Sequence, residues 1–178
     1  LLYLGDTGLR RGLITVLEAL NFLIPIIPNI KIVIVGKSKE DSILKDFVAR
    51  NNYQSYVIFE GWQDFNLFQS YIIASNIGIC PIHKNLHHDT TYANKIFQYM
   101  ALGRPIVVSD CTSQQNLVED YKCGLVFSDR NPKDFADKII TLYQDNKYYQ
   151  ELSKNANLAV KENLNWETTS KSLIKLYN

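Results

Sequence analysis

The chain has 178 residues, a formal net charge of +1 and 46% hydrophobic residues, which is enough apolar material for one well-buried core. The near-zero charge excludes a general electrostatic attraction to nucleic acid or to anionic membranes. No apolar run reaches the roughly 20 residues that span a bilayer. The three cysteines (Cys80, Cys111 and Cys123) match neither an even disulfide set nor a metal-binding spacing, which favours a reducing compartment, and we expect a cytoplasmic protein.

The opening residues LLYLGD begin inside an apolar run, with neither a Met nor the charged leader of a signal peptide. A strand that opens a chain without a lead-in predicts that these residues are a piece of a longer protein. The rest of the sequence contains no Pro/Gly/Ser-rich linker and no internal repeat. We therefore expect residues 1–178 to form a single domain.

Short apolar runs rich in β-branched residues alternate with helical patterns up to Phe127, and the pattern beyond it is helical only. The predicted strands are LLYLG, KIVIVG, YVIFEG, NIGICPI, RPIVVSD and GLVF. The predicted helices are Arg11–Phe22, Glu40–Arg50, Asp64–Ala74, Asn94–Leu102, Ser113–Asp120, Pro132–Gln144, Lys147–Lys161 and Trp166–Tyr177. Strands that are apolar throughout and separated by helices predict a parallel sheet covered on both faces. The predicted fold class is α/β: three layers, α/β/α, around a six-stranded parallel sheet, followed by C-terminal helices.

Open parallel sheets bind ligands outside the carboxyl ends of their strands. Functional residues are therefore expected in the segments that follow the strands, which are Asp6–Gly12, Lys37–Asp41, Gly61–Asp64, His83–Asn94 and Asp110–Gln115. Gly36 and Gly61 stand at two strand ends, where glycine lets the backbone approach a ligand closely.

The predicted helix from Asn94 carries two polar residues, Lys95 and Gln98, on one face. Thr91 or Asn94 is expected to cap its start. A lysine in the first turn opposes the helix dipole, and a bound anion would reverse that penalty. The local pattern fits a solvated surface lysine equally well. The apolar stripe expected to pack on the sheet consists of Ile96, Phe97, Met100 and Ala101.

The stretch NKIFQYMALGRPIVVSD resembles the signature K-hydrophobic-F-E-Y-M-A-x-G-x-P-V-V in the C-terminal domain of GT-B glycosyltransferases of the glycosyl transferases group 1 (GT4-like) family. The resemblance covers the whole chain. LLYLGDTGLRRGLITVLEAL is similar to the family's opening strand, phosphate loop and helix, and CGLVFSDRNPKDFADKIITLYQD is similar to a later strand and helix. Six segments match in the right order and spacing, so the resemblance is specific.

This resemblance implies a Rossmann-like domain that binds a nucleotide-diphosphate sugar. It would be the C-terminal half of a two-domain hexosyltransferase whose N-terminal acceptor domain is absent, so these residues alone are expected to be inactive. In the family, transfer usually retains the anomeric configuration and uses no metal or other cofactor. The implied setting is bacterial polysaccharide or glycoconjugate synthesis. Any peripheral membrane contact would run through the missing lobe.

The resemblance also implies site residues, although it assigns no catalytic residue. Arg11 matches the basic residue that grips the diphosphate, which a guanidinium does bidentately. Lys95, beside Asn94, faces the diphosphate, and Gln98 stands where a glutamate binds the ribose. The glutamate near the sugar falls on Thr90, or loosely on neighbouring Asp89.

Further implied contacts and departures concern the strand ends. Backbone at Gly36 and Gly61 would approach the donor, and Trp62 could wall the base pocket or fold onto the core. Asp6 stands where many members place a second phosphate-binding arginine.

Three other functions stay open. The departures at Asp6, Thr90 and Gln98 favour a degenerate binding module that keeps the fold without turnover. A sugar-nucleotide epimerase lobe shares the architecture, and a flavodoxin-like signalling domain is more distant. The segment HKNLHHD invites a metal site, but its histidines would converge only on a helix, and we expect a loop there.

Overall fold

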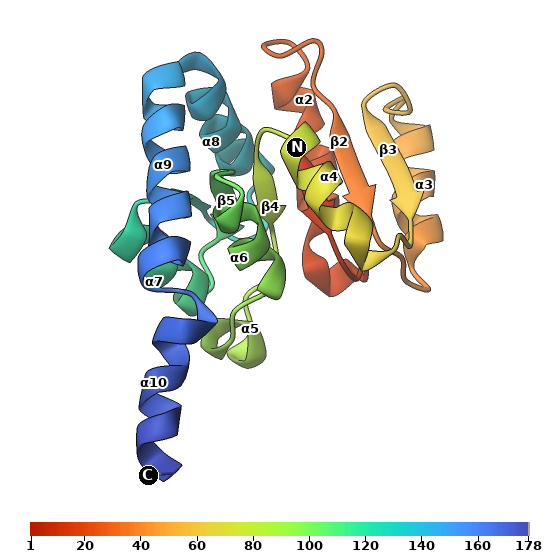
Figure 1. Ribbon diagram of the computed structural model, residues 1–178. Helices are drawn as coiled ribbons and strands as arrows, with labels where there is room; N and C mark the ends of the chain where they lie inside the picture. Colours follow the sequence, from red (N-terminus) through yellow and green to blue (C-terminus); the bar gives the residue numbers. More distant parts are fainter. Residues whose placement is uncertain (178) are drawn as a thin grey trace.

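The computed structural model describes residues 1–177, with all of their side chains except those of residues 172 and 173. Six parallel strands form one sheet in the spatial order β3-β2-β1-β4-β5-β6 (Figure 1). The strands are β1 (Leu2–Leu4), β2 (Ile32–Val35), β3 (Val57–Gly61), β4 (Gly78–Cys80), β5 (Ile106–Ser109) and β6 (Gly124–Phe127). This confirms the predicted α/β fold with a six-stranded parallel sheet.

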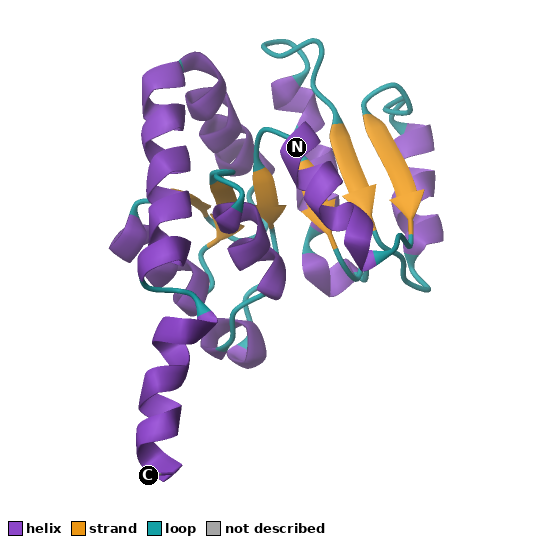
Figure 2. Cartoon of the chain, viewed as in Figure 1, coloured by secondary structure: helices purple, strands orange, loops and turns teal. Residues whose placement is uncertain are grey.

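Helices cover the sheet and continue beyond it at the C-terminal end (Figure 2). They are η1 (Leu9–Arg11), α1 (Leu13–Glu18), α2 (Leu20–Leu23), α3 (Asp41–Arg50), η2 (Phe65–Leu67), α4 (Phe68–Ala74), α5 (Leu86–Thr90), α6 (Asn94–Ala101), α7 (Thr112–Tyr121), α8 (Pro132–Gln144), α9 (Asn146–Glu162) and α10 (Trp166–Tyr177). Within residues 1–177, no helix is long and apolar enough to cross a membrane.

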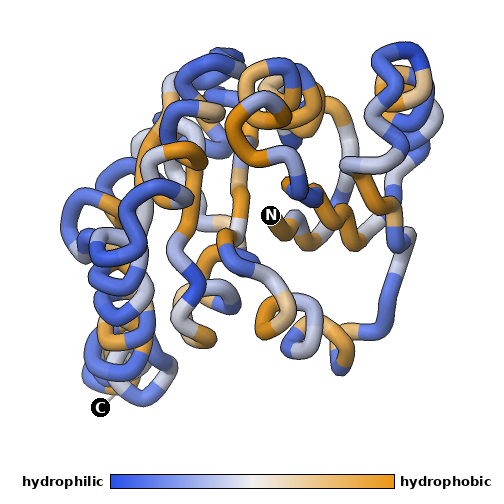
Figure 3. The backbone as a smooth tube through the Cα atoms, turned by 90° about the horizontal axis from the view of Figure 1, so that it is seen from above, coloured by the Kyte–Doolittle hydropathy of each residue, from blue (hydrophilic) through white to orange (hydrophobic). Residues whose placement is uncertain are grey.

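Two hydrophobic cores lie on opposite faces of the sheet, because successive side chains of a strand point to opposite sides. Tyr3 joins the core beneath α1, α2, α3 and α8, whereas its neighbours Leu2 and Leu4 join the core beneath α4, α6, α7 and α9. In Figure 3 the segment that begins at the N-terminus lies in the middle of the molecule and is largely hydrophobic. The result is the predicted three-layer arrangement, with β1 buried on both faces.

Two predicted helices have a different start. The helix expected over Arg11–Phe22 begins with the 3-10 turn η1 and is divided into α1 and α2. The helix expected from Asp64 likewise begins with the 3-10 turn η2, which Asp64 caps by accepting a hydrogen bond from the Asn66 N–H. Three-ten turns at helix starts are common, and sequence periodicity does not distinguish them from α-helix.

The strand order reverses direction between β1 and β4, which creates the switch point where ligands bind in open α/β sheets. At this point the loop after β1 turns toward one face and the loop after β4 toward the other. A crevice is therefore expected between residues 5–12 and residues 81–93, at the carboxyl ends of the two central strands.

Candidate functional site

A hollow of about 390 Å³ lies at this switch point. It draws on three segments: the end of β1 and the turn after it, η2 with the start of α4, and residues 92–98 before and within α6. Its lining residues are Leu4, Gly5, Asp6, Arg11, Phe65, Phe68, Tyr92, Ala93, Asn94, Lys95 and Gln98. Cationic, amide and aromatic side chains thus meet in one concave site, as in small-molecule sites generally.

The loop after β1 is packed tightly against the end of β4. Gly12 adopts a left-handed conformation with φ of +73°, and a Cβ atom there would lie 1.8 Å from the carbonyl oxygen of Pro81. The backbone N–H of His83 donates to the carbonyl of Arg10 at 3.0 Å. Only glycine tolerates both the conformation and the contact, so Gly12 fixes where Arg11 enters the hollow.

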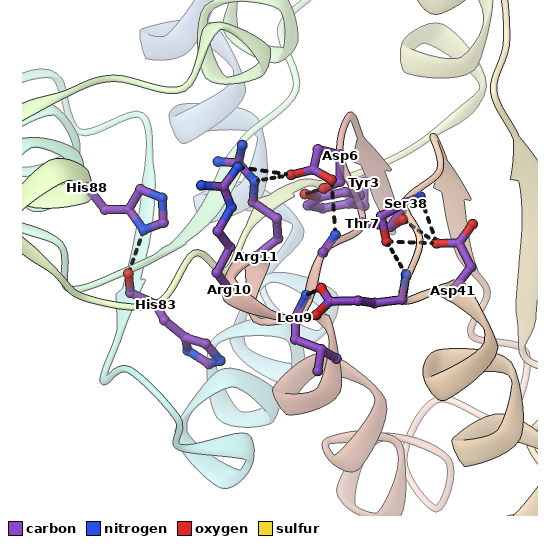
Figure 4. Close-up of polar contacts among 12 residues, drawn as sticks. Tyr3, Asp6, Thr7, Leu9, Arg10, Arg11, Ser38, Asp41, His83 and His88 are labelled. Atoms are coloured by element: carbon purple, nitrogen blue, oxygen red, sulfur yellow. Dashed lines mark hydrogen bonds and ion pairs between the residues drawn. The ribbon is translucent and has the colours of Figure 1, made fainter.

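Acidic side chains from the start of α3 hold the same loop from the other side. Glu40 accepts a hydrogen bond from the Leu9 N–H at 2.7 Å. Asp41 accepts from the Thr7 hydroxyl and from the Ser38 N–H (Figure 4). The loop is therefore pre-formed, and several of its donors are already bonded to carboxylates.

Asp6 forms a cluster with the two neighbouring arginines (Figure 4). Its carboxylate lies 3.1 Å from Nε of Arg11 and 3.4 Å from Nη2 of Arg10, and it accepts from the Gly8 N–H at 3.2 Å. Partial burial pushes the pKa of Asp6 upward, but the Gly8 N–H and Arg11 outweigh it, so the pKa lies below its ordinary value. Asp6 is therefore charged at neutral pH.

Lys95 enters the hollow from the first turn of α6. Its Nζ lies 3.7 Å from the centre of the Tyr3 ring, a close cation–π contact. Burial, together with the nearby Arg11, lowers the pKa of Lys95 from 10.5 to about 8. None of the ion pairs among the described residues includes Lys95. A cation held without a counter-ion at a helix start is suited to bind an anion.

Helix α6 is anchored by Tyr99 rather than by the full stripe predicted from the sequence. Tyr99 is fully buried and its hydroxyl accepts the Leu4 N–H at 2.9 Å, whereas Ala101 is exposed. The Tyr99 ring lies over Gly78, where a Cβ atom would come within 2.2 Å of it. This packing ties α6 to β1 and β4, and so sets the positions of Lys95 and Gln98.

The family model described as Glycosyl transferases group 1 matches residues 1–145. The chain belongs to the glycosyl transferases group 1 family. It is 27% identical over 149 residues to an uncharacterized glycosyltransferase of Methanocaldococcus jannaschii, a match that covers 84% of this chain and 37% of the relative. It is also 22% identical over 186 residues to spore coat protein SA of Bacillus subtilis. The chain spans less than half the length of these curated relatives, 37% and 48%.

Solved structures share the fold. The C-terminal domain of a glycosyl transferase group 1 family protein (LpcC) from Francisella tularensis has a TM-score of 0.80 at 19% identity, covering 93% of this chain and 85% of that one. HepE of Anabaena, solved in complex with UDP, has a TM-score of 0.85 at 16% identity, covering 99% of this chain and 48% of that one. HepE has also been solved with UDP-glucose. The GT-B C-terminal domain fold implied by the family resemblance is confirmed.

The structure brings four of the predicted site residues together. Arg11, Asn94, Lys95 and Gln98 line the same hollow, although Arg11 and Lys95 lie 84 positions apart in the chain. They come from η1 after β1 and from α6 after β4, two segments that the parallel topology makes neighbours. Their roles toward a donor stay predictions.

Gly36 and Gly61 do not line the hollow. A Cβ at Gly36 would lie 1.8 Å from the carbonyl oxygen of Gly5, so this glycine lets the ends of β1 and β2 approach each other. Gly61 has φ of +67° with open space around it and accepts the Gly36 N–H through its carbonyl. In this structure both glycines serve the turns at the strand ends.

Thr90 also lies outside the hollow, in a short helix where the sequence predicts a loop. Helix α5 is capped by Asn85, and the Thr90 hydroxyl donates to the Leu86 carbonyl. Neighbouring Asp89 accepts the Thr112 N–H at 2.9 Å and so caps α7. The sugar-side position therefore has no carboxylate directed into the hollow from α5.

The start of α6 differs from the predicted cap. Ala93 occupies the cap position without a side-chain hydrogen bond, and the Thr91 hydroxyl donates to the His87 carbonyl instead. Neither Thr91 nor Asn94 caps the helix. The Ile96 N–H donates to the Ala93 carbonyl at 3.0 Å, and no side chain caps the helix, so the N–H groups of Asn94 and Lys95 remain open to a ligand.

Three aromatic lining residues were missed by sequence reasoning. Phe65, Phe68 and Tyr92 reach the hollow from η2, α4 and the segment before α6, while Trp62 is 67% exposed and does not line it. The only signal for them in the sequence is that aromatic residues follow the third and fourth predicted strands. Which of the aromatic side chains after β3 faces the hollow depends on the η2 turn.

The histidine-rich segment gives no metal site. Among the described residues, no group of three or more His, Cys, Asp or Glu side chains could hold a metal ion. Helix α5 begins at Leu86, after His83, so His83 and His87 do not share a helical face. His83 instead places its Nδ1 2.7 Å from Asp129.

A larger groove of about 640 Å³ lies at the opposite, amino-terminal edge of the sheet. Its lining is largely apolar with several amide side chains and a single lysine, and it includes Leu1, Ile27, Lys31, Asn76, Ile139 and Tyr149. It has no cluster of cations. Chemistry and topology therefore both favour the smaller hollow at the carboxyl edge.

Proposed function

We propose that this chain is the donor-binding lobe of a retaining glycosyltransferase that uses a nucleotide-diphosphate sugar. One observation carries the proposal: Arg11 of η1 and Lys95 of α6 converge on a hollow at the switch point, which the uncapped start of α6 also lines. Two cations and free N–H groups at one point are the groups that a diphosphate requires. The UDP and UDP-glucose complexes of the similar HepE support this assignment.

The hollow offers a place for each part of the donor. Lys95 and Arg11 would bind the diphosphate, and Lys95 would do so without first breaking an ion pair among the described residues. Gln98, one turn further along α6, would accept a ribose hydrogen bond through its amide oxygen. Phe65 and Tyr92 provide exposed rings at the rim, against which a base would stack.

The remaining parts of the proposal concern the longer protein. A second, N-terminal lobe would bind the acceptor and close the cleft, so residues 1–178 alone would bind donor without transferring sugar. Transfer would proceed with retention at the anomeric carbon and without a metal. The protein would act in the cytoplasm in polysaccharide or glycoconjugate synthesis, and any membrane contact would lie in the other lobe.

The test is a nucleotide-binding screen of the 178-residue chain by isothermal titration and thermal shift. UDP, GDP and ADP and their common sugar conjugates are compared, each with and without EDTA. One base should bind, and saturation at one hundred times the dissociation constant should stabilise the fold by about 2.7 kcal/mol. Binding should be unaffected by EDTA.

Arg11→Met is the matched variant, with exposed Arg50→Met on α3 as the control. We expect the first to lose binding and the second to keep it. Binding of no nucleotide by the chain or by the full-length protein would refute the donor-lobe proposal. Loss of binding in EDTA would refute its metal-independent part.

A second function has three features in its favour. Asp6 pairs with the arginines of the phosphate loop, Thr90 is turned away and Gln98 replaces a carboxylate, so a non-catalytic binding module also fits the site. The two functions differ in turnover. Full-length protein that binds the nucleotide sugar but neither hydrolyses nor transfers it with any acceptor would favour the binding module.

A further inference from the structure

Asp6 is bonded to Arg11, the phosphate-loop cation that lines this hollow, and to two neighbouring donors outside its lining. Its carboxylate contacts Nε of Arg11, Nη2 of Arg10 and the Gly8 N–H, the guanidinium and backbone donors of the loop. The next backbone donor, the Leu9 N–H, is bonded to Glu40. An incoming diphosphate therefore meets a loop that already holds an anion of its own.

Arg10 and Arg11 differ in their exposure and in their position relative to the hollow. The Arg11 side chain is 24% exposed and lines the hollow, whereas the Arg10 side chain is 64% exposed and does not. Asp6 is 39% exposed, so its carboxylate can turn from Arg11 toward Arg10 and water when another anion arrives. Ion pairs at this exposure contribute little to stability, so breaking the Asp6–Arg11 contact costs little, and the main effect of Asp6 on a bound anion is the repulsion between their charges.

We propose that Asp6 is a charge-selecting residue that competes with the donor diphosphate for Arg11, and that it weakens binding of a nucleoside diphosphate more than binding of a nucleotide-diphosphate sugar. This inference rests on the proposed function, since it concerns the same hollow. Asp6 thereby favours the intact donor over the product that remains after sugar transfer.

The physical basis is the difference in ligand charge. A nucleotide-diphosphate sugar carries about two negative charges, whereas the free nucleoside diphosphate carries about three at pH 7.5, because its terminal phosphate ionises a second time. Asp6 repels each ligand in proportion to that charge. For an assumed separation of about 7 Å between the displaced Asp6 carboxylate and the ligand phosphates, in a water-like medium, the repulsion weakens binding by roughly threefold for each ligand charge.

The test compares the wild-type chain with Asp6→Asn, which keeps the shape and an oxygen for the Gly8 N–H. The ligands are UDP, UDP-glucose and inorganic pyrophosphate, titrated at low and high salt. We expect affinity to rise by about eightfold for UDP-glucose and about twentyfold for UDP, and both gains to shrink in salt. Asp46→Asn, an exposed carboxylate on α3, is the control for net charge, and Asp6→Ser checks that the effect does not depend on Asn.

Several outcomes would overturn the inference. They include equal gains for UDP and UDP-glucose, and gains no larger than those of Asp46→Asn. Weaker binding of UDP-glucose would also overturn it, since it would mean that Asp6 binds the sugar or orients Arg11. No binding of any of the three ligands by either protein would overturn it as well. If Asp6→Asn binds pyrophosphate more tightly but neither protein binds a nucleotide, the competition is supported and the donor-lobe proposal is refuted. If both proteins bind the nucleotides with equal affinity, the donor-lobe proposal is supported and the role of Asp6 is refuted.

Discussion

Replacing Lys95 by Met should stabilise the fold at neutral pH while it weakens nucleotide binding. Lys95 holds a charge in a half-buried position with no ion-pair partner among the described residues. Methionine is similar in length, removes the charge, and can keep a contact with the Tyr3 ring through its sulfur. A residue that lowers stability for the sake of binding is typical of a functional site.

The gain in stability expected for Lys95→Met is the difference between two opposing effects. Burial lowers the pKa of Lys95 from 10.5 to about 8, and each unit is worth about 1.4 kcal/mol, so charging Lys95 in the folded state costs about 3 kcal/mol. The cation–π contact with Tyr3 offsets about 1–2 kcal/mol of this cost. Lys95→Met should therefore stabilise the fold by about 1–2 kcal/mol at pH 7, which raises Tm by about 4 °C in a chain of this size.

The stability gain of Lys95→Met should decrease at high pH. Below pH 8 Lys95 is protonated in both the folded and unfolded states, so the full cost is present. Between about pH 8 and 10.5 the unfolded state binds more protons than the folded state, and wild-type stability rises relative to the variant. The advantage of Lys95→Met should thus be constant below pH 8 and fade above it.

Urea unfolding at pH 7, 8, 9 and 10 measures this difference, with the exposed Lys161→Met on α9 as the control. Titration with the nucleotide identified in the screen should show at least tenfold weaker binding for Lys95→Met and none of this loss for the control. A variant that is destabilised at pH 7, or whose advantage does not change with pH, would refute the account of Lys95 as a destabilising buried cation. Unchanged nucleotide binding would refute its role in the site.

Three further variants test the packing and the ligand contacts. Tyr99→Phe leaves the buried Leu4 N–H without an acceptor and should cost about 2 kcal/mol in urea unfolding. Gly12→Ala puts a Cβ against the Pro81 carbonyl in a left-handed turn, which should cost about 2 kcal/mol or more and abolish nucleotide binding. Gln98→Glu should tighten binding of the free nucleoside about fivefold by calorimetry, because a charged acceptor strengthens the ribose hydrogen bond.

A specific result would refute the prediction for each of these three variants. Tyr71→Phe removes a half-buried hydroxyl that contacts Glu60 and should cost well under half as much as Tyr99→Phe, so equal losses would refute the anchoring role of Tyr99. Gly12→Ala with wild-type binding would show that the loop geometry is not needed. Nucleoside binding that Gln98→Glu leaves unchanged would remove Gln98 from the ribose site.

The sequence by itself determined the sheet. The six apolar runs became the six strands, because the central strands of a parallel sheet covered on both faces are hydrophobic throughout. It also determined which loops carry the site, since parallel topology collects the carboxyl ends of strands at one edge. Arg11 and Asn94 lie in segments named on this ground, whereas the family resemblance assigned Arg11, Lys95 and Gln98 to the donor; all four line the hollow.

The tertiary structure alone decided how the side chains in that site are engaged. Asp6 stood out as a carboxylate beside a phosphate loop, but its pairing with Arg10 and Arg11 depends on the turn of η1. Helix α5 escaped prediction because five residues are too short for a periodic pattern, and the helix depends on the Asn85 cap. Thr90 was turned away from the hollow by the same helix.

One physical reason explains why the sequence determines the strands and helices but not the orientation of single side chains in the site. Strand and helix patterns reflect burial over many residues, and their summed free energy outweighs local alternatives. The orientation of one side chain in a loop depends on a few hydrogen bonds and close contacts with residues distant in sequence, such as Tyr99 with Leu4 and Gly12 with Pro81. Those contacts exist only once the chain is folded.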